Sequence, residues 1–334
     1  MSSRSFLTTH APDGGLLQSD EWAKLQIASG HEAMSFQGSG FEGIAFQHTL
    51  PVIGKYLFIP RGPVANTASL DAESLKSEFI RMAESSRAHW LRIEPQTEAC
   101  LQSLKQVFGA NEIVPAPRDI NPRETFMVSL TGTIEEWFGR MKSKTRYNVR
   151  LAEKHGVSIR FSRTPEDVES FTDLIYATTN RKAIAPHPKA YYRNFIAVLP
   201  EEMCTIALAE HEGQVIAASL LVFFNGTASY LHGGSADTKR ELMAPFLLHL
   251  KAMEEAKRRG CARYDFGGVR IRSKQGDETS WDGITRFKQG FDSNAETLLF
   301  PGTYDIILSP FRYSLYRQFR QLIRLRTKVW NFFR

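Results

Sequence analysis

Hydrophobic and polar positions along the chain follow two alternating periods. From Leu16 the segment LLQSDEWAKLQIASG has a helical period, Ser19 is a suitable N-cap, and Gly30 stands just past the end of the run. Other segments with a helical period predict helices at 71–86 and 100–109. Shorter apolar runs bounded by Gly and Pro predict strands at 40–50, 55–64 and 89–95.

A similar order of elements recurs in the second half. A helix is predicted from Thr133, with Glu135 and Glu136 in a first turn where the helix dipole favours acids, and it continues to Gly156. The later pattern predicts strands at 157–162, 204–210, 214–226, 227–235 and 262–269, and helices at 165–183, 189–199 and 245–260. Consecutive antiparallel strands followed by a helix and a strand are typical of an N-acetyltransferase-like fold.

Length and composition narrow the class of protein. At 334 residues the chain suits two domains of about 150 residues each. With 42% hydrophobic against 23% charged residues, it is a globular enzyme rather than a disordered or fibrous chain. We expect it to stay in the cytoplasm, because no segment reads as a signal peptide or a membrane span. Cys100, Cys204 and Cys261 lack metal-ligand spacing, so we predict buried thiols and no metal site.

The net charge of +6 is concentrated at the C-terminus. No acidic residue follows Asp305, whereas seven cations do: Arg312, Arg317, Arg320, Arg324, Arg326, Lys328 and Arg334. As a helix this tail is amphipathic, and Trp330, Phe332 and Phe333 at its end suit a lipid interface. We expect peripheral contact with the inner membrane face, with tRNA binding and packing on the first domain as the alternatives.

The first segment with candidate chemistry is basic. Residues 142–150 read KSKTRYNVR. On a helix, Lys142, Arg146 and Arg150 recur every four residues and so share one face. That face is suited to a phosphate, or it is a solvated basic face that binds nothing.

Two further segments follow strands or alternate cations with apolar residues. YDFGGV, at 264–269, ends a strand with paired glycines, which allow close backbone approach or a positive φ. Its Asp265 is a base, a positioning acceptor or a turn residue. In WDGITRFKQGF, at 281–291, Arg286 and Lys288 alternate with apolar residues, so Lys288 is either a clamp for phosphate or an oxyanion, or a surface lysine.

Several common enzyme motifs are missing from the sequence. It contains no GxxxxGK[ST], GxSxG or HExxH. His187, between two prolines, and His249, on an apolar helix, are isolated in the sequence, which favours structural roles for both.

Eight segments in this order resemble the Fem family of non-ribosomal peptidyltransferases, which builds the interpeptide bridges of bacterial cell walls. They are LLQSDEW, YLFIPRGPV, LRIEP, SKTRYNVRLAEKHGV, YLHGGS, EEAKRRG, YDFGGV and RFKQGF, and they extend from about Leu16 to Tyr304. The resemblance implies an α/β (α+β) fold of two tandem N-acetyltransferase (GNAT)-like domains, with no helical hairpin arm. The first domain would comprise 1–145 and, returning to it, about 300–334; the second would comprise 146–299.

The resemblance also implies an activity. Aminoacyl-tRNA would be the donor and a peptidoglycan precursor, lipid II or UDP-MurNAc-pentapeptide, the acceptor of the aminoacyl group. No metal or nucleotide cofactor is implied, and we expect a monomer. Lys288 matches the family lysine beside the precursor's diphosphate and the reacting centre. Asp265 and Glu94 are candidate proton acceptors, and the candidates for substrate contact are Arg286, Tyr191, Tyr192, Tyr230, Arg181, His187 and Arg146.

One of these candidates departs from the family pattern. The family places an arginine four residues before a tyrosine for phosphate contact, and His187 holds that position here. A neutral histidine holds phosphate less firmly than a bidentate arginine, so either Arg181 substitutes or the precursor sits differently.

Two other classes of function remain open. One is an acyl-CoA-dependent N-acyltransferase of the same fold, which Met243 disfavours because a phosphate-binding loop would place glycine there. The other is a non-catalytic protein that binds a membrane surface or RNA through the basic tail.

Overall fold

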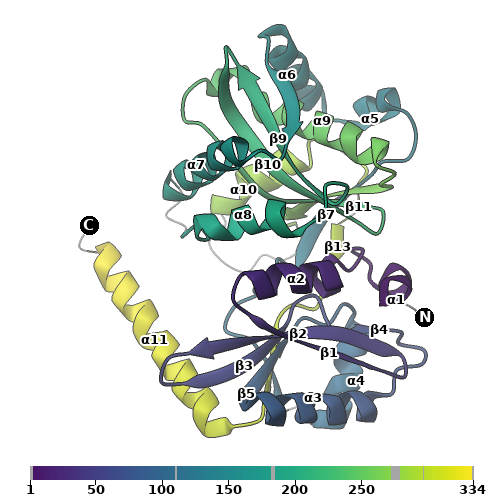
Figure 1. The fold of residues 1–334 in the computed structure, drawn as a ribbon, viewed down its shortest axis with the longest axis vertical. Coiled ribbons are helices and arrows are strands. Elements are labelled where there is room, and N and C mark those ends of the chain that lie inside the picture. Colours follow the sequence, from purple (N-terminus) through teal and green to yellow (C-terminus); the bar gives the residue numbers. More distant parts are fainter. Residues whose placement is uncertain (1–2, 110, 182–184, 272–278, 296, 333–334) are drawn as a thin grey trace. The chain divides into compact units, whose positions relative to one another are not determined.

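The computed structural model describes residues 3–109, 111–181, 185–271, 279–295 and 297–332. Side chains are described for these residues except 3, 279–280 and 323–332. The chain forms two compact units (Figure 1), unit 1 from 1–121 with 300–334, and unit 2 from 122–299. Each unit has its own sheet and helices, which confirms the predicted α/β fold class.

Unit 1 is built on a mostly antiparallel sheet with strand order β1-β2-β3-β5-β14-β6, and β4 pairs with β2. The parallel pair is β3 and β5, which are joined through a helix. The strands are β1 (Glu32–Gly38), β2 (Phe41–Leu50), β3 (Gly54–Ile59), β4 (Val64–Ala65), β5 (Ala88–Ile93), β6 (Ile113–Pro115) and β14 (Tyr304–Ile307). The helices are α1 (Ser3–His10), the 3₁₀ turn η1 (Leu16–Gln18), α2 (Asp20–Ala28), α3 (Ala72–Ser86), α4 (Glu98–Phe108) and α11 (Pro310–Phe332).

Apolar faces of α3 and α4 form the core of unit 1 with the sheet. Leu75, Phe79 and Leu104 are fully buried against strand residues such as Leu91 and Ile306. Since Ile306 lies on β14, the C-terminal segment completes the sheet between β5 and β6. Residues far apart in the sequence therefore share this core.

Unit 2 repeats the plan, with strand order β13-β7-β12-β11-β10-β9-β8 and one parallel pair, β11 with β12. Its strands are β7 (Glu124–Ser129), β8 (Ser158–Ser162), β9 (Cys204–His211), β10 (Gln214–Phe224), β11 (Thr227–Ser235), β12 (Arg263–Gly268) and β13 (Thr297–Leu299). Its helices are α5 (Ile134–Arg140), α6 (Ser143–Lys154), α7 (Pro165–Arg181), α8 (Lys189–Val198), the 3₁₀ turn η2 (Arg240–Leu242), α9 (Ala244–Arg258) and α10 (Thr279–Lys288).

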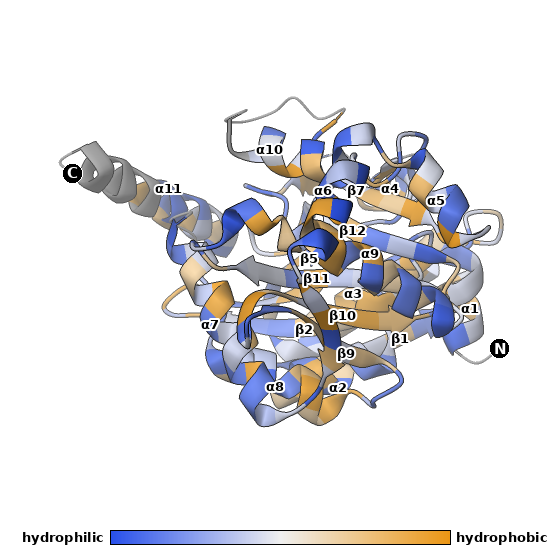
Figure 2. Ribbon diagram, turned by 90° about the horizontal axis from the view of Figure 1, so that it is seen from above, coloured by the Kyte–Doolittle hydropathy of each residue, from blue (hydrophilic) through white to orange (hydrophobic). Residues whose placement is uncertain are grey.

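Helices cover both faces of the unit 2 sheet. Side chains of α6 and α9 share a core with alternate residues of β9, Ala207 and Ala209, while α7 and α8 lie on the other side (Figure 1). Hydrophobic residues concentrate in the strands and inner helix faces, and outer helix faces are mostly hydrophilic (Figure 2). Cys204 and Cys261 in unit 2, like Cys100 in unit 1, are buried free thiols, as predicted.

The boundary between the units differs from the prediction. Residues 122–145 belong to unit 2 and not to the first domain, because Met127 and Thr125 of β7 pair with Asp265 of β12 and Leu298 of β13. The return of the chain to unit 1 at 300 matches the sequence-based value.

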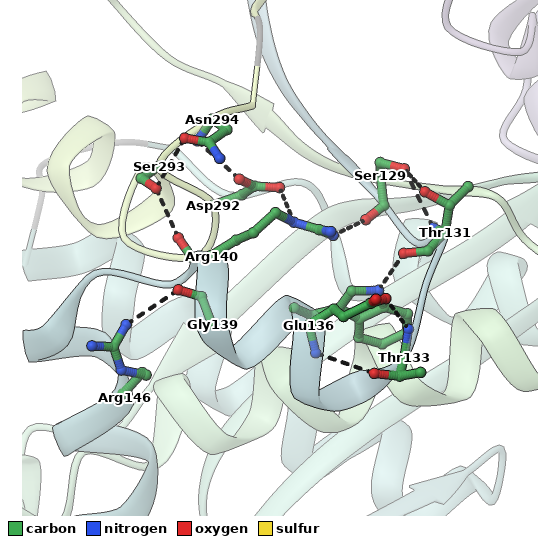
Figure 3. Close-up of polar contacts among 11 residues, drawn as sticks. Ser129, Thr131, Thr133, Glu136, Gly139, Arg140, Arg146, Asp292, Ser293 and Asn294 are labelled. Carbon is green, nitrogen blue, oxygen red and sulfur yellow. Dashed lines mark hydrogen bonds and ion pairs between the residues drawn. The ribbon is translucent and has the colours of Figure 1, made fainter.

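The single helix predicted from Thr133 to Gly156 is also wrong. Met141 and Lys142 have extended backbone angles and separate α5 from α6. Figure 3 shows the contacts around this break: Arg140 donates to the Asp292 carboxylate at 3.1 Å, and Ser293 donates through both its N–H and its hydroxyl to the Arg140 carbonyl. These long-range bonds redirect the chain where local propensity favours a continuous helix.

Among the described residues, no helix combines the length and the apolar character that crossing a bilayer requires.

Candidate functional site

A cavity of about 500 Å³ opens within unit 2. Residues of β10 and β11, the start of α9 and one face of α10 form its walls. Most of the lining is apolar or small, including Ala217, Met243 and Phe287, and the polar side chains include Tyr230 and Lys288. An apolar pocket with a few convergent polar groups is typical of a substrate site.

Lys288 is the buried cation of this cavity. It ends α10, is only 8% exposed, and its Nζ donates to the Gly268 carbonyl at 2.7 Å. The Lys288 ammonium therefore lies where the RFKQGF and YDFGGV segments meet, at the end of β12. The alternative of a surface lysine is wrong.

The two glycines beside Lys288 meet the two expectations separately. Gly267 has a φ of +72°, which favours glycine, and a Cβ there would be in ordinary contact with the Lys288 Nζ at 3.8 Å. At Gly268 a Cβ would lie 2.6 Å from the Pro122 Cγ, so this position requires glycine for a close approach. The Asp265 carboxylate accepts from the Gly267 N–H at 2.7 Å and from the Thr125 hydroxyl, so Asp265 fixes the turn that presents the Gly268 carbonyl.

The start of α6 joins the same region. The Lys142 N–H donates to the Gly290 carbonyl at 2.9 Å, and a Cβ on Gly290 would clash with the Thr145 hydroxyl. Glycine is therefore needed there for close packing. This contact connects the basic segment 142–150 with the end of α10, a pairing that the sequence does not reveal.

Tyr230 and His249 contribute polar groups to the lining of the cavity. Their rings lie 4.6 Å apart edge to face, and the His249 Nδ1 is 2.9 Å from the buried Tyr264 hydroxyl. Burial, with a smaller contribution from Lys288, lowers the pKa of His249 to about 3, so this imidazole is neutral. Burial raises the pKa of Tyr230 to about 12, so its hydroxyl stays protonated.

A second aromatic cluster lies on the α8 side of the sheet. His187 stacks on Tyr191 with ring centroids 4.2 Å apart, and His232 contacts both of them and Tyr192 edge to face. Burial, and next the charge of His187, lowers the pKa of His232 to about 3. The structure thus brings three of the predicted contact residues together.

A β-bulge separates this cluster from the cavity. Leu221 pairs with Tyr230 and Leu220 with His232, so Leu231 is an extra residue in β11. Side chains two apart on a regular strand share a face. The bulge instead directs Tyr230 toward His249 and His232 toward α8.

The predicted arginines lie in three different settings. Both terminal nitrogens of Arg181 donate to the Ser235 carbonyl at 3.1 Å, and the guanidinium also pairs with Asp237 at 2.8 Å. Arg146 donates to the Gly139 carbonyl at the end of α5 (Figure 3), and also to the Met141 carbonyl. Arg286 is exposed on α10.

Glu94 lies in unit 1, and its carboxylate is saturated with donors. Oε1 accepts from the Asn121 N–H at 2.9 Å and the Thr303 hydroxyl at 2.8 Å, while Oε2 accepts from the Arg61 N–H at 3.1 Å and the Asn121 side chain at 2.6 Å. Glu94 thereby ties β5 to the returning C-terminal segment, which is a structural role.

The N-terminus of α9 borders the cavity but is poorly equipped for a diphosphate. Met243 precedes the helix with a φ of +54°, a conformation that glycine adopts more easily. Pro245 has no N–H, and the Phe246 N–H donates to the Met243 carbonyl at 3.0 Å. Two of the first three helix positions therefore offer no N–H to a phosphate.

A family model described as FemAB matches residues 113–212 and 201–321, which together cover more than half of the chain. The chain belongs to the FemAB family. This result confirms the resemblance inferred from the eight segments.

Similar proteins extend over nearly all of this FemAB-family chain. The lipid II:glycine glycyltransferase of Staphylococcus haemolyticus is 21% identical over 406 aligned positions, which cover 97% of this chain and 96% of that protein. The Staphylococcus aureus protein of the same name is 21% identical over 409 positions, with the same coverage. These relatives confirm the predicted enzyme class, an aminoacyltransferase.

Solved structures agree on the fold. FemX superposes with a TM-score of 0.78 at 20% identity, covering 93% of this chain and 96% of FemX. L-PGS from Bacillus licheniformis has a TM-score of 0.57 at 15% identity, covering 92% and 90%.

Sequence reasoning missed some residues of the site. His249 was assigned a structural role alone, yet it also lines the cavity, and Trp281 contributes to the α10 wall. The sequence signal for this role was one histidine, His249, among mostly apolar residues in 245–252. The contact of His249 with Tyr230 joins α9 to β11, and no local sequence pattern reveals that these two elements meet.

Proposed function

We propose that this chain transfers an amino acid from aminoacyl-tRNA to the stem-peptide amine of a peptidoglycan precursor, in the formation of cell-wall bridges. The observation that carries the proposal is a buried lysine, Lys288, on the wall of the unit 2 cavity in a member of the FemAB family. Relatives named lipid II:glycine glycyltransferase support a lipid II-type acceptor.

The chemistry is aminolysis of an ester. The stem-peptide nitrogen attacks the aminoacyl carbonyl carbon, an N–C bond forms, the C–O bond to the ribose breaks, and a proton from the amine ends on the ribose oxygen. The Lys288 ammonium stabilises the negative charge that develops on the carbonyl oxygen, or the diphosphate of the precursor beside it. Partial burial strengthens this interaction relative to bulk water.

Alignment of the two substrates supplies much of the rate in this proposal. The neutral imidazole of His249 and the protonated hydroxyl of Tyr230 give the cavity a polar, uncharged wall beside the lysine. Asp265 acts through the turn that holds Lys288, so we assign it a positioning role rather than that of a base.

An acyl-CoA donor is less consistent with the cavity. Enzymes that bind the CoA pyrophosphate at a helix start use a row of backbone N–H groups. At α9, Pro245 and Phe246 do not supply them. This geometry favours aminoacyl-tRNA over CoA.

The test is a transfer assay on the purified full chain. The protein is incubated with labelled aminoacyl-tRNA and either lipid II or UDP-MurNAc-pentapeptide, and products are identified by mass spectrometry. We expect one added aminoacyl residue on one acceptor and no transfer from acyl-CoA. Lys288→Met should lower the rate about 100-fold or more, the usual loss when a charge-stabilising donor is removed.

The exposed Lys154 at the end of α6 provides the matched control. Lys154→Met removes the same charge without reaching the cavity and should transfer at the wild-type rate. Equal rates for wild type and Lys288→Met would remove Lys288 from the site, and acyl-CoA acting as the donor would overturn the proposed reaction.

A further inference from the structure

The C-terminal helix α11 has two faces that differ in what they contact. Tyr313 and Tyr316 face unit 1 and are buried. Tyr316 stacks on the Trp90 ring with centroids 4.9 Å apart, and Tyr313 meets the same ring edge to face at 5.8 Å. The first turns of α11 are therefore anchored to β5.

Polar bonds reinforce this anchor. The Tyr313 hydroxyl donates to the Asp305 carboxylate at 2.8 Å, and Arg92 donates to the Tyr316 hydroxyl at 3.0 Å. Further along, Arg320 donates to the same Tyr316 hydroxyl at 3.3 Å. The side of α11 that faces the protein is thus aromatic at its start and basic beyond it.

Three other apolar side chains of the helix are exposed. Phe311, Phe319 and Leu322 are 75%, 52% and 61% exposed. At 3.6 residues per turn the three lie within about 80° of one another; Phe311 and Leu322 are on the side opposite Tyr313, and Phe319 is about 60° from Tyr316. Leu315, which lies between Phe311 and Phe319 around the helix, packs partly against the core with the two tyrosines. An amphipathic helix normally buries its apolar residues, and these three stay exposed.

The charge of the segment is complementary to an anionic surface. The seven cations that follow Asp305 have no acidic neighbour in the sequence. A helix with basic residues on one side and exposed aromatic and aliphatic residues on the other is suited to lie in a lipid interface. Each basic residue near an anionic membrane adds about 1 kcal/mol of attraction.

We propose that α11 docks on an anionic phospholipid surface through Phe311, Phe319 and Leu322, while Tyr313 and Tyr316 hold the helix on unit 1. The predicted contribution of Trp330, Phe332 and Phe333 falls outside the described side chains and is not part of this surface. The proposal is independent of the transferase activity, since it requires no peptidoglycan precursor in the membrane.

Vesicle flotation with the full chain tests the proposal. The vesicles are phosphatidylcholine alone, or phosphatidylcholine mixed with phosphatidylglycerol, each at low and high salt. We expect binding to the mixed vesicles that weakens with salt. Replacing Phe311, Phe319 and Leu322 together by Ser should reduce the partition coefficient about tenfold or more, because it removes the apolar contacts.

The matched control replaces exposed polar residues of the same helix that lie outside the proposed surface, namely Ser314→Ala and Gln321→Ala together. This variant should bind as wild type does, and circular dichroism should show that both variants are folded. Replacing Arg324, Arg326 and Lys328 by Gln should reduce binding to the mixed vesicles and its salt dependence.

Two parallel experiments test whether this surface instead binds a second copy of the chain or tRNA. Size-exclusion chromatography detects a second copy of the chain, and filter binding detects tRNA. The proposal is overturned if wild type does not float with the mixed vesicles, or if the Ser variant floats equally well. It is also overturned if the Ser variant loses only self-association or tRNA binding.

Discussion

Units 1 and 2 each bury a cation, and the two cations differ in what surrounds them. Arg92 in unit 1 donates to both carboxylate oxygens of Asp305, at 2.7 and 2.8 Å, and to Tyr316. Lys288 in unit 2 donates to a backbone carbonyl and also lines a cavity of about 500 Å³. The Arg92 guanidinium is paired with a carboxylate, whereas the Lys288 ammonium borders a cavity of substrate size.

The comparison separates structural charges from functional ones. Glu94 resembles Arg92, because the protein itself supplies donors to both of its oxygens. A buried charge saturated in this way stabilises a fold, and a buried charge that borders a substrate-sized cavity is a candidate for chemistry.

The largest expected effect is on the stability of unit 1. Arg92→Met leaves the Asp305 carboxylate buried without its cation, and we expect the free energy of unfolding to fall by about 3–5 kcal/mol. Denaturant titration followed by tryptophan fluorescence measures it through Trp90, which stacks on Tyr316. The double variant with Asp305→Leu should be more stable than the single one; a double variant that is less stable would contradict the assigned pairing.

The same type of substitution in unit 2 should affect activity instead. Lys288→Met removes the hydrogen bond to the Gly268 carbonyl, and we expect the free energy of unfolding to fall by less than the loss expected for Arg92→Met. Transfer should fall about 100-fold, which corresponds to about 3 kcal/mol of transition-state stabilisation. A variant that unfolds as readily as Arg92→Met would place Lys288 among the structural charges.

A pH effect of intermediate size is expected from two histidines of unit 2, the buried His249 and the partly buried His232. His232 and His249 have pKa values of about 3 in the folded chain, below the ordinary 6.5, so the unfolded chain binds more protons between these values. Stability should therefore be lost as the pH falls below about 6.5, by about 1–2 kcal/mol for each histidine at pH 5. His249→Gln should reduce the loss of unfolding free energy between pH 7 and pH 5 by the contribution of this one histidine. If the variant loses as much stability between these pH values as the wild type, the assignment is wrong.

The smallest effect concerns Arg146. Because it donates to the Met141 and Gly139 carbonyls, Arg146→Gln should reduce stability by about 1 kcal/mol and leave the transfer rate nearly unchanged. Thermal unfolding and the transfer assay measure the two effects. A large loss of activity without loss of stability would instead support phosphate binding by Arg146.

Several features of the site were predictable because they depend on local chemistry. Gly267 and Gly268 end β12, and the positive φ of Gly267 and the close approach of Pro122 to Gly268 match the two expectations for paired glycines. Lys288 alternates with apolar residues in the sequence and was a candidate clamp for phosphate or an oxyanion, and its side chain lines the cavity. The strand-helix-strand order predicted the α/β fold in both units.

Other features depend on contacts between distant segments and could not be predicted. The helix expected from Thr133 to Gly156 breaks at Met141, where Arg140 meets Asp292, and β7 joins unit 2 through its pairing with β12. Glu94 was a candidate base until Thr303, about 200 residues later, was found to donate to it. Local propensity is weaker than these tertiary contacts.

The sequence by itself determined the periodicity of the elements, the family resemblance and the chemistry that each motif carries, because these depend on residue types and short spacings. Only the tertiary structure decided which charges are neutralised and which way the apolar face of α11 points. Its helical pattern fits inward or outward packing equally well. The contacts of Tyr313 and Tyr316 with Trp90 bury these two side chains, and Phe311, Phe319 and Leu322 stay exposed.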